Sequence, residues 1–123
     1  MVLISCGSSL EPSKNYTDFK IIIGKPIKIK NLEVAQNDFS QYMTWNEAKK
    51  ECEKLGSGWR LPTKDELNIL YQNKDKIVGF ANLYYWSSTE VDLTSAWGQN
   101  FTNGDETNAS KTYLFHVRAI RAF

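Results

Sequence analysis

The chain has 123 residues, the usual length of one domain with a single hydrophobic core. Hydrophobic residues make up 41% and charged residues 24%, which is typical of a globular protein. The formal net charge of +1 gives no strongly basic surface, so we expect no nucleic-acid partner. No segment approaches the roughly 20 apolar residues that a membrane-spanning helix needs.

Residues 1–19 are predicted to form an N-terminal tether, because they are mostly small or polar and include Pro12. Within it, Leu3-Ile4-Ser5-Cys6-Gly7 resembles the end of a bacterial lipoprotein signal, in which Cys6 would be lipidated. The charged start and most of the apolar run of such a signal are missing. Two explanations stay open: the true start lies upstream, or the match is accidental. If the true start lies upstream, we expect the protein to contact a membrane only through a lipid anchor, at the bacterial cell envelope or surface.

The domain is predicted to cover residues 20–123 and to begin with a strand. Ile27 and Ile29 alternate with lysines, and this period of two is typical of a half-buried strand. Leu32 and Val34 are expected to continue the same strand, with a bulge after Asn31.

Two capping boxes predict two helices. Thr44 is followed three residues later by Glu47, and Thr63 by Glu66, so that each threonine and glutamate can satisfy the free N–H groups of a first helical turn. Trp45, Ala48, Cys52 and Leu55 then recur at helical spacing and define a buried face. The second helix is expected to end near Asn73.

After Gly79 the sequence favours strands, which we place at residues 84–89, 96–101 and 112–122. The order of elements, with helices early and strands late, indicates an α+β domain. We expect two helices packed on a small antiparallel sheet with long loops.

Several motifs occur together, and their order resembles that of a known family. The motifs are Thr44-Trp45 with Ala48, Gly58-Trp59-Arg60-Leu61-Pro62-Thr63, Tyr85-Trp86-Ser87-Ser88-Thr89-Glu90, Ala96-Trp97, and Val117-Arg118-Ala119-Ile120-Arg121. They resemble the Lcl C-terminal domain family, which has a C-type-lectin-like fold. The resemblance implies a non-enzymatic surface module of bacteria or phages that binds protein or glycan ligands without a cofactor. Localisation at a cell surface or association with a phage follows as an expectation.

The resemblance also implies that a disulfide has been lost. Many relatives carry a cysteine near Ala119 that would pair with the one at Cys52, and here that position is alanine. We therefore expect Cys52 to be a buried reduced thiol, which behaves as a small hydrophobic side chain.

Sites for metal binding or catalysis are weakly supported. Asp105 and Glu106 lie in one polar loop, and Glu90 and Asp92 in another, but the calcium-binding lectin pattern is absent. We interpret both loops as solvated and assign no metal, with a weak calcium site as the alternative. His116 is the only histidine and has no nucleophile at a recognisable spacing, so we interpret it as structural.

Three arginines, Arg60, Arg118 and Arg121, stand in a chain that otherwise favours lysine. Guanidinium groups suit both anion recognition and paired contacts with carboxylates. We favour a structural role, with Glu66, Asp65 or loop carbonyls as partners.

The ligand-binding face is predicted in the segment from Val91 to Phe115, because binding residues commonly lie on loops of a rigid scaffold. The candidate residues are Val91, Asp92, Leu93, Thr94, Ser95, Gly98, Asn100, Thr102, Asn103, Asp105, Thr107, Asn108, Ala109, Leu114 and Phe115. Relatives of this fold are diversified by retroelements that mutate adenines, and Asn codons altered in this way can yield every one of these residues. We expect this face to be such a diversified surface.

Two other classes of function compete with ligand display. One is a fixed structural or oligomerisation module of an envelope lipoprotein, in which these loops are simply solvated. The other is an enzyme acting on glycans, which would need titratable groups that converge in a cleft and have shifted pKa values.

Overall fold

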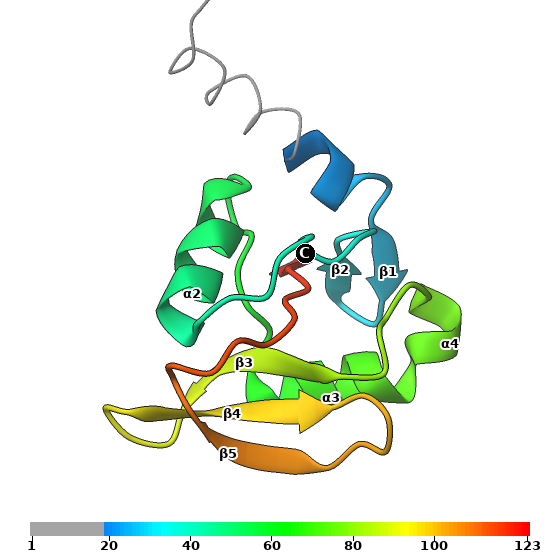
Figure 1. The fold of residues 1–123 in the computed structure, drawn as a ribbon. Helices are drawn as coiled ribbons and strands as arrows, with labels where there is room; N and C mark the ends of the chain where they lie inside the picture. The colour runs from blue at the N-terminus through cyan, green and yellow to red at the C-terminus, as the bar shows by residue number, and fades with distance from the viewer. Residues whose placement is uncertain (1–18) are drawn as a thin grey trace, which may run out of the picture.

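The computed structural model describes residues 19–123 (Figure 1). The proposed lipidation residue, Cys6, lies outside the described residues. Residues 19–23 are helical, and Phe19 is half-buried against the main hydrophobic core. The folded part therefore includes Phe19, which the sequence placed in the tether.

Both predicted helices are present, and both begin at the predicted capping boxes. Helix α2 spans Trp45–Lys54, and the side chain of Thr44 accepts a hydrogen bond from Glu47 N. Helix α3 spans Lys64–Gln72 and is capped in the same way by Thr63 and Glu66. A short further helix that the sequence did not indicate, α4, follows at Lys74–Ile77.

The strands form two antiparallel sheets of three strands each, where we expected one. The first sheet contains β1 (Ile27–Ile29), β2 (Leu32–Val34) and β6 (Ile120–Ala122), in the order β1-β2-β6. The predicted bulge after Asn31 is wrong, because the chain reverses there and β1 and β2 pair as a hairpin, with Lys30 at a φ of 54°. The second sheet contains β3 (Tyr84–Glu90), β4 (Ser95–Asn100) and β5 (Glu106–Ser110), in the order β3-β4-β5.

The prediction of one strand over residues 112–122 is wrong. The third strand of the second sheet is instead β5, which lies in a stretch that we interpreted as a polar loop. Residues 113–119 run between the two sheets and make isolated bridges, Phe115 to Met43 and His116 to Tyr85, before β6 joins β2. Side chains of an extended segment alternate whether or not it lies in a sheet, so the period of two could not show where this segment pairs.

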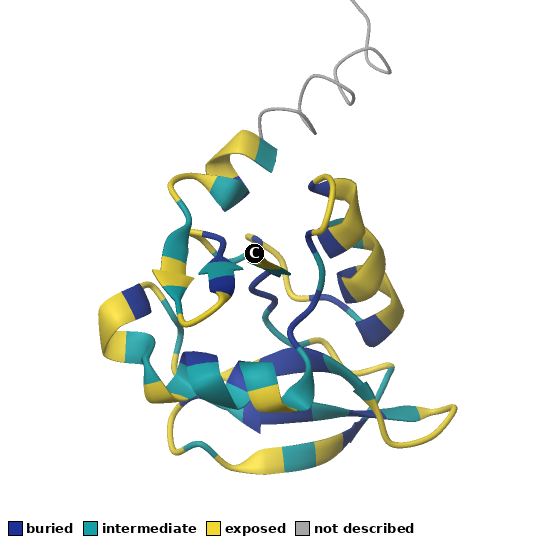
Figure 2. Cartoon of the chain, turned by 180° about the vertical axis from the view of Figure 1, so that it is seen from behind, coloured by how far each residue is buried: buried dark blue, intermediate teal, exposed yellow. Residues whose placement is uncertain are grey.

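Strand β3 separates two hydrophobic cores. Trp86 packs in the core formed with α2, and its neighbour Tyr85 points the other way, into the core formed with α3. Two buried tryptophan N–H groups are satisfied, since Trp86 Nε1 donates to Met43 O and Trp45 Nε1 to Ser87 O, both at 2.8 Å. Buried residues line β3, β4 and the inner side of α2 in Figure 2, while the outer side of α2 is exposed.

The contacts of Arg60 and Arg121 confirm the structural role that we favoured for the arginines. Arg60 makes two hydrogen bonds to Glu66, at 2.7 and 3.0 Å, and so ties the start of α3 to the preceding segment. Arg121 pairs with Glu33 of the neighbouring strand at 2.9 Å. Cys52 is a buried free thiol, and burial raises its pKa.

Candidate functional site

The predicted binding residues do not form one continuous face. The loop between β3 and β4, residues 91–94, lies at one end of the second sheet, and the loop between β4 and β5, residues 101–105, lies at the other (Figure 1). Both loops are largely exposed, and Leu93 has 90% of its surface accessible. A single small ligand cannot contact both loops.

Internal hydrogen bonds shape the loop of residues 91–94. Asp92 Oδ1 accepts hydrogen bonds from Thr94 N at 2.9 Å and from Thr94 Oγ1 at 3.1 Å, and these lower the pKa of Asp92. Lys111 Nζ donates to Glu90 at 2.6 Å and to the carbonyl oxygen of Leu93 at 3.0 Å. The loop therefore presents the apolar side chain of Leu93 to solvent on a fixed backbone.

The loop of residues 101–105 uses its polar side chains in a similar way. Asn100 Oδ1 accepts from Thr102 N at 2.8 Å, and Asn103 Oδ1 accepts from Asp105 N at 2.9 Å. Thr102 Oγ1 donates to the carbonyl oxygen of Asn82 at 2.8 Å. Of these candidates, Thr102, Asn103 and Asp105 are exposed, and Asn100 is half-buried.

Two candidate residues are corrected by the structure. Ala109 is 3% exposed and packs in the core with α2, and Gly98 is also buried. Phe115 is half-buried and covers Gly98, with its ring centroid 4.3 Å from that of Trp86. Alternation along β4 and β5 turns these positions toward the core, so neither Ala109 nor Gly98 offers a side chain to a ligand.

An apolar groove of about 170 Å³ lies beside Phe115, lined by Tyr42, Leu83, Tyr84, Leu114, Phe115 and His116. Five of the ten large hydrophobic side chains that are exposed within residues 19–123 lie in it or next to it, and they are Tyr42, Leu83, Tyr84, Tyr113 and Leu114. The Tyr84 ring stacks on the Phe115 ring at 5.1 Å, so the groove has an aromatic wall. Solvent-exposed apolar side chains gathered in this way commonly mark a contact surface.

The sequence indicated only Leu114 and Phe115 of this groove. Tyr42 comes from the segment before α2, and Leu83 and Tyr84 come from the start of β3, so the groove forms only when distant segments meet. Asn100 pairs with Tyr84 in the sheet and brings one further candidate to its edge. No local pattern in the sequence could have found Tyr42.

A buried polar network lies beneath the groove. Asp38 accepts a hydrogen bond from Arg118 Nε at 2.6 Å and one from the Tyr85 hydroxyl at 2.5 Å. Burial raises the pKa of Tyr85, so the hydroxyl keeps its proton. His116 Nδ1 lies 3.9 Å from Asp38, and burial lowers the pKa of His116, which keeps its ring neutral at neutral pH. The groove is therefore lined by uncharged side chains.

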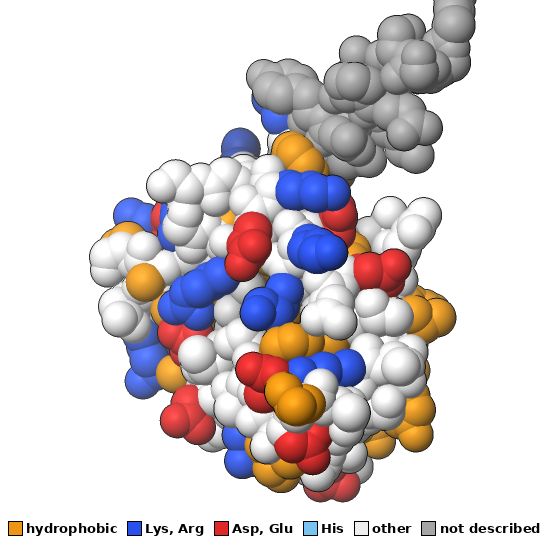
Figure 3. Space-filling view, turned by 90° about the vertical axis from the view of Figure 1, so that its left-hand side faces the viewer, with side chains coloured by type: hydrophobic (Ala, Val, Ile, Leu, Met, Phe, Trp, Pro, Cys, Tyr) orange, Lys and Arg blue, Asp and Glu red, His pale blue; other side chains and the backbone are white. Residues whose placement is uncertain are grey.

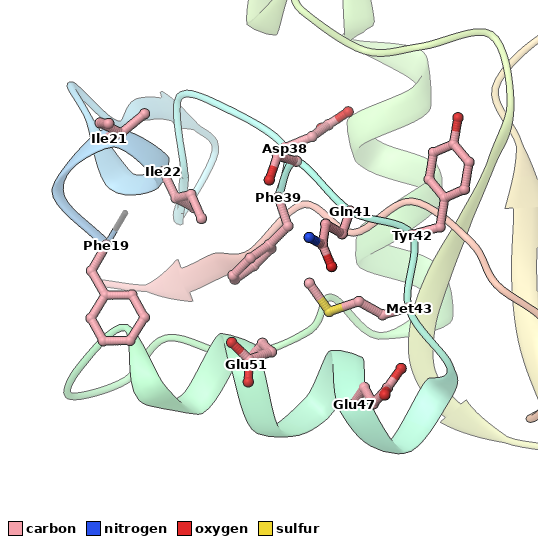
Figure 4. Close-up of a pocket in the computed structure, with 11 residues that line it drawn as sticks. Phe19, Ile21, Ile22, Asp38, Phe39, Gln41, Tyr42, Met43, Glu47 and Glu51 are labelled. Carbon is pink, nitrogen blue, oxygen red and sulfur yellow. The ribbon is translucent and has the colours of Figure 1, made fainter. Parts of the chain in front are cut away.

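A larger cavity of about 560 Å³ lies between the helical residues 19–23 and α2. Figure 4 shows Ile22, Phe39 and Met43 directed into this space, with Glu47 and Glu51 carried by α2. Tyr42 contributes to the cavity and to the groove alike. No pattern in the sequence indicates this cavity, because it forms only where residues 19–22 meet the segment 38–43 and α2.

The outer face of α2 differs from both hollows. Lys49, Lys50 and Lys54 are exposed there, and Figure 3 shows lysine and arginine side chains interspersed with acidic ones on this side of the molecule. Charges of both signs are typical of an ordinary solvated surface.

No group of three or more histidine, cysteine, aspartate or glutamate side chains within residues 19–123 is arranged to hold a metal ion. The two acidic loops considered for calcium lie at opposite ends of the second sheet, so their carboxylates do not converge (Figure 1). In the same part of the chain, no helix is long and apolar enough to cross a membrane.

Comparison with known proteins identifies the fold. The model of the Lcl C-terminal domain matches residues 28–121. Among solved structures, botrocetin is 12% identical, with a TM-score of 0.63 over 80% of this chain and 96% of that chain. EMS16, described as an antagonist of a collagen-receptor integrin, is 12% identical, with a TM-score of 0.60 over 81% of this chain and 98% of that one.

A complex of botrocetin with a mutant von Willebrand factor A1 domain gives a TM-score of 0.56 at 13% identity, over 81% of this chain and 98% of that chain. These matches are C-type-lectin-like proteins of snake venoms, and the C-type-lectin-like fold is thereby confirmed. No curated protein sequence matches the chain.

Proposed function

The chain belongs to the Lcl C-terminal domain family, and we propose that it is a non-enzymatic binding module whose main contact surface is the groove beside Phe115. The observation that carries this proposal is the gathering of exposed Tyr42, Leu83, Tyr84 and Leu114 around one concave, uncharged site. An exposed apolar surface of this kind costs free energy in water unless a partner covers it.

The size of the groove favours a protein ligand. Its volume of about 170 Å³ is smaller than the roughly 300–1,000 Å³ of a typical small-molecule site and suits one large side chain of a partner. Protein interfaces commonly centre on such an anchor in a desolvated pocket, and tyrosines such as Tyr42 and Tyr84 lose little conformational entropy on contact. Two of the structures of similar fold are named for protein targets, a von Willebrand factor domain and an integrin. A glycan is the alternative ligand.

The exposed candidates would supply variable contacts, those of residues 101–105 next to the groove and those of residues 91–94 at the far end of the second sheet. The exposed candidates are Val91, Asp92, Leu93, Thr94, Thr102, Asn103, Asp105, Asn108 and Leu114. They can change without disturbing the core, which is the property that retroelement diversification requires. Gly98 and Ala109 are framework positions and should stay constant. A nearby reverse transcriptase gene, with a near-copy of codons 91–115 that differs at adenines, would establish diversification; its absence would leave a surface of fixed specificity.

A lipid anchor at Cys6 would hold the module at the bacterial envelope or surface. Its support is the sequence around Cys6 alone. The test is expression in a bacterial host with the native upstream DNA, followed by labelling with a radioactive fatty acid. Label in the wild type that disappears in Cys6→Ser supports the anchor, and an unlabelled wild type contradicts it.

The groove itself is tested with two variants of exposed residues. Leu114→Asp places a charge in the groove, and Phe123→Asp is the matched control, because Phe123 is equally exposed but lies at the chain end, outside the groove. Wild type and variants are applied to arrays of surface proteins and of glycans. We expect protein ligands that bind wild type and the control but bind Leu114→Asp at least tenfold more weakly, as for a central contact residue.

A third variant, Leu93→Asp, separates the groove from the loop of residues 91–94. Binding that depends on Leu93 and not on Leu114 would move the contact surface to that loop. Binding of glycans alone would exclude the protein ligand, and ligands unaffected by all three substitutions would contradict the proposal.

A further inference from the structure

The groove and the larger cavity adjoin each other. Tyr42 lines both hollows, and its ring meets the His116 ring edge-on at 4.5 Å. The backbone of the Tyr42 segment is fixed on the side of the groove, because Met43 and Phe115 exchange two hydrogen bonds, at 3.0 and 3.1 Å. A ligand that extends from the groove past Tyr42 would therefore reach the cavity.

The cavity differs from the groove in charge. Its floor is apolar, with Ile22, Phe39 and Met43 all buried, but its rim carries Asp38, Glu47 and Glu51. Among residues 19–123, none of those that line it is a lysine, an arginine or a histidine. The cavity therefore combines an apolar interior with negatively charged side chains at its rim, whereas the groove is apolar and uncharged.

Two of the three carboxylates are available to a ligand. Asp38 is already compensated by Arg118 and the Tyr85 hydroxyl. Glu47 uses one oxygen, Oε1, to accept from Thr44 N at 3.0 Å, and hydrogen bonds from Thr44 lower its pKa and keep it ionised. Glu51 pairs with the exposed Lys54 at 2.8 Å, and such surface pairs hold their partners weakly.

Glu47 and Glu51 lie one turn apart on α2, where two like charges repel each other. A cation between them would relieve this repulsion, and the apolar floor would accept the aliphatic part of a lysine or arginine side chain.

We propose that the partner is a protein segment that carries an apolar or aromatic anchor close to one or more basic residues. The anchor fills the groove, and the basic side chain crosses Tyr42 and enters the cavity between Glu47 and Glu51. The inference rests on the proposed binding function of the groove and adds the charge of the partner. It also distinguishes this surface from a general hydrophobic contact, because only a basic segment satisfies both hollows.

The test is selection of binding peptides from a random dodecapeptide library displayed on phage, with the full chain as the target. Enriched peptides are synthesised, and their affinities are measured by fluorescence anisotropy for wild type, for Leu114→Asp and for the double variant Glu47→Gln/Glu51→Gln. Glutamine at position 47 can keep the capping box, so the double variant should fold normally. The matched control is Glu53→Gln/Asp75→Asn, which removes two exposed carboxylates that line neither hollow.

We expect enriched peptides to combine a large apolar residue with lysine or arginine. Leu114→Asp should weaken their binding at least tenfold, and Glu47→Gln/Glu51→Gln about fivefold, as for two partly solvated ion pairs. The control should bind as the wild type does. Raising the salt concentration to about 0.5 M should remove the difference between wild type and the glutamine variant, because salt screens such pairs.

Two results overturn the inference and are distinguishable. Peptides that depend on Leu114 but carry no excess of basic residues, and that bind the glutamine variant equally well, would leave the groove as a binding site and exclude the cationic partner. A selection that yields no peptide sensitive to Leu114→Asp would contradict the inference together with a peptide-binding groove.

Discussion

The aromatic ring of Phe115 rests directly on the backbone of Gly98. A Cβ atom placed on Gly98 would lie 2.7 Å from Phe115 Cε2 and 3.0 Å from the carbonyl oxygen of Tyr85, closer than carbon atoms normally approach. The groove depends on this contact, because the same ring stacks on Tyr84 and packs against Trp86. Gly98 therefore fixes the aromatic wall of the groove without touching a ligand.

We predict that Gly98→Ala destabilises the protein by about 1–3 kcal/mol, the usual cost of overpacking a core. The free energy of unfolding in urea measures this effect. If the Phe115 ring is the obstacle, Gly98→Ala should cost less in a Phe115→Leu background, because leucine leaves more room. An equal cost in both backgrounds would locate the strain at the Tyr85 carbonyl group instead.

The ion pair between Asp38 and Arg118 should dominate the electrostatic part of the stability. Arg118 is 1% exposed, and Asp38→Asn would leave its charge buried without a counter-ion. We expect a loss of about 3–5 kcal/mol in the free energy of unfolding. Glu33→Gln is the matched control, because its partner Arg121 is 37% exposed, and it should cost less than about 1 kcal/mol. Similar costs for the two variants would contradict this assignment.

His116 should make the protein less stable in mild acid. Burial lowers its pKa below the ordinary value of 6.5, so the unfolded chain binds a proton more readily than the folded one. The resulting contribution to stability is complete above pH 6.5 and is lost as the pH falls through the lowered pKa of the folded state. Urea unfolding at a series of pH values from 7.5 to about 4.5 tests this sign. His116→Gln should remove this part of the pH dependence, and an unchanged profile would contradict the prediction.

Val78 holds a backbone conformation that a β-branched residue rarely adopts. Its φ is 59° and its ψ is 166°, a region that glycine enters freely, and its side chain is exposed. We predict that Val78→Gly raises the free energy of unfolding by about 1 kcal/mol through relief of this strain. Val91→Gly makes the same change where φ is not positive, and it should lower stability instead. A loss of stability at both positions would contradict the strain at Val78.

The helices could be predicted from the sequence because their signals are local. Thr44 with Glu47 and Thr63 with Glu66 define the first turn of each helix within four residues, and the structure begins both helices there. The strands were harder to predict from the sequence. Residues 112–122 alternate like one strand, yet Phe115 and His116 bridge to different segments and only Ile120–Ala122 joins a sheet. Pairing depends on partners far away in the chain, and alternation does not identify them.

The residues of the candidate site, too, could be predicted from the sequence only in part. Exposed loop positions such as Leu93 and Asn103 follow from polar, turn-rich sequence, and the structure leaves them exposed. Ala109 and Gly98 were placed on the same face and are buried, since small residues occur both in loops and where a strand packs closely. Tyr42 was missed because it is a single aromatic residue in a segment that carries no motif. Tyr84 was missed because the sequence indicates a strand there but not that its side chain stays exposed beside Phe115.

The sequence by itself determined the family, the α+β class and the two capped helices, because these depend on residue types at short and fixed spacings. Only the tertiary structure decided that Tyr42, Tyr84 and Leu114 meet at one groove, and that Glu47 and Glu51 border a cavity next to it. The physical reason is that burial is a collective property of the packed chain. Side chains that are alike in sequence become core or contact surface according to which distant segments cover them.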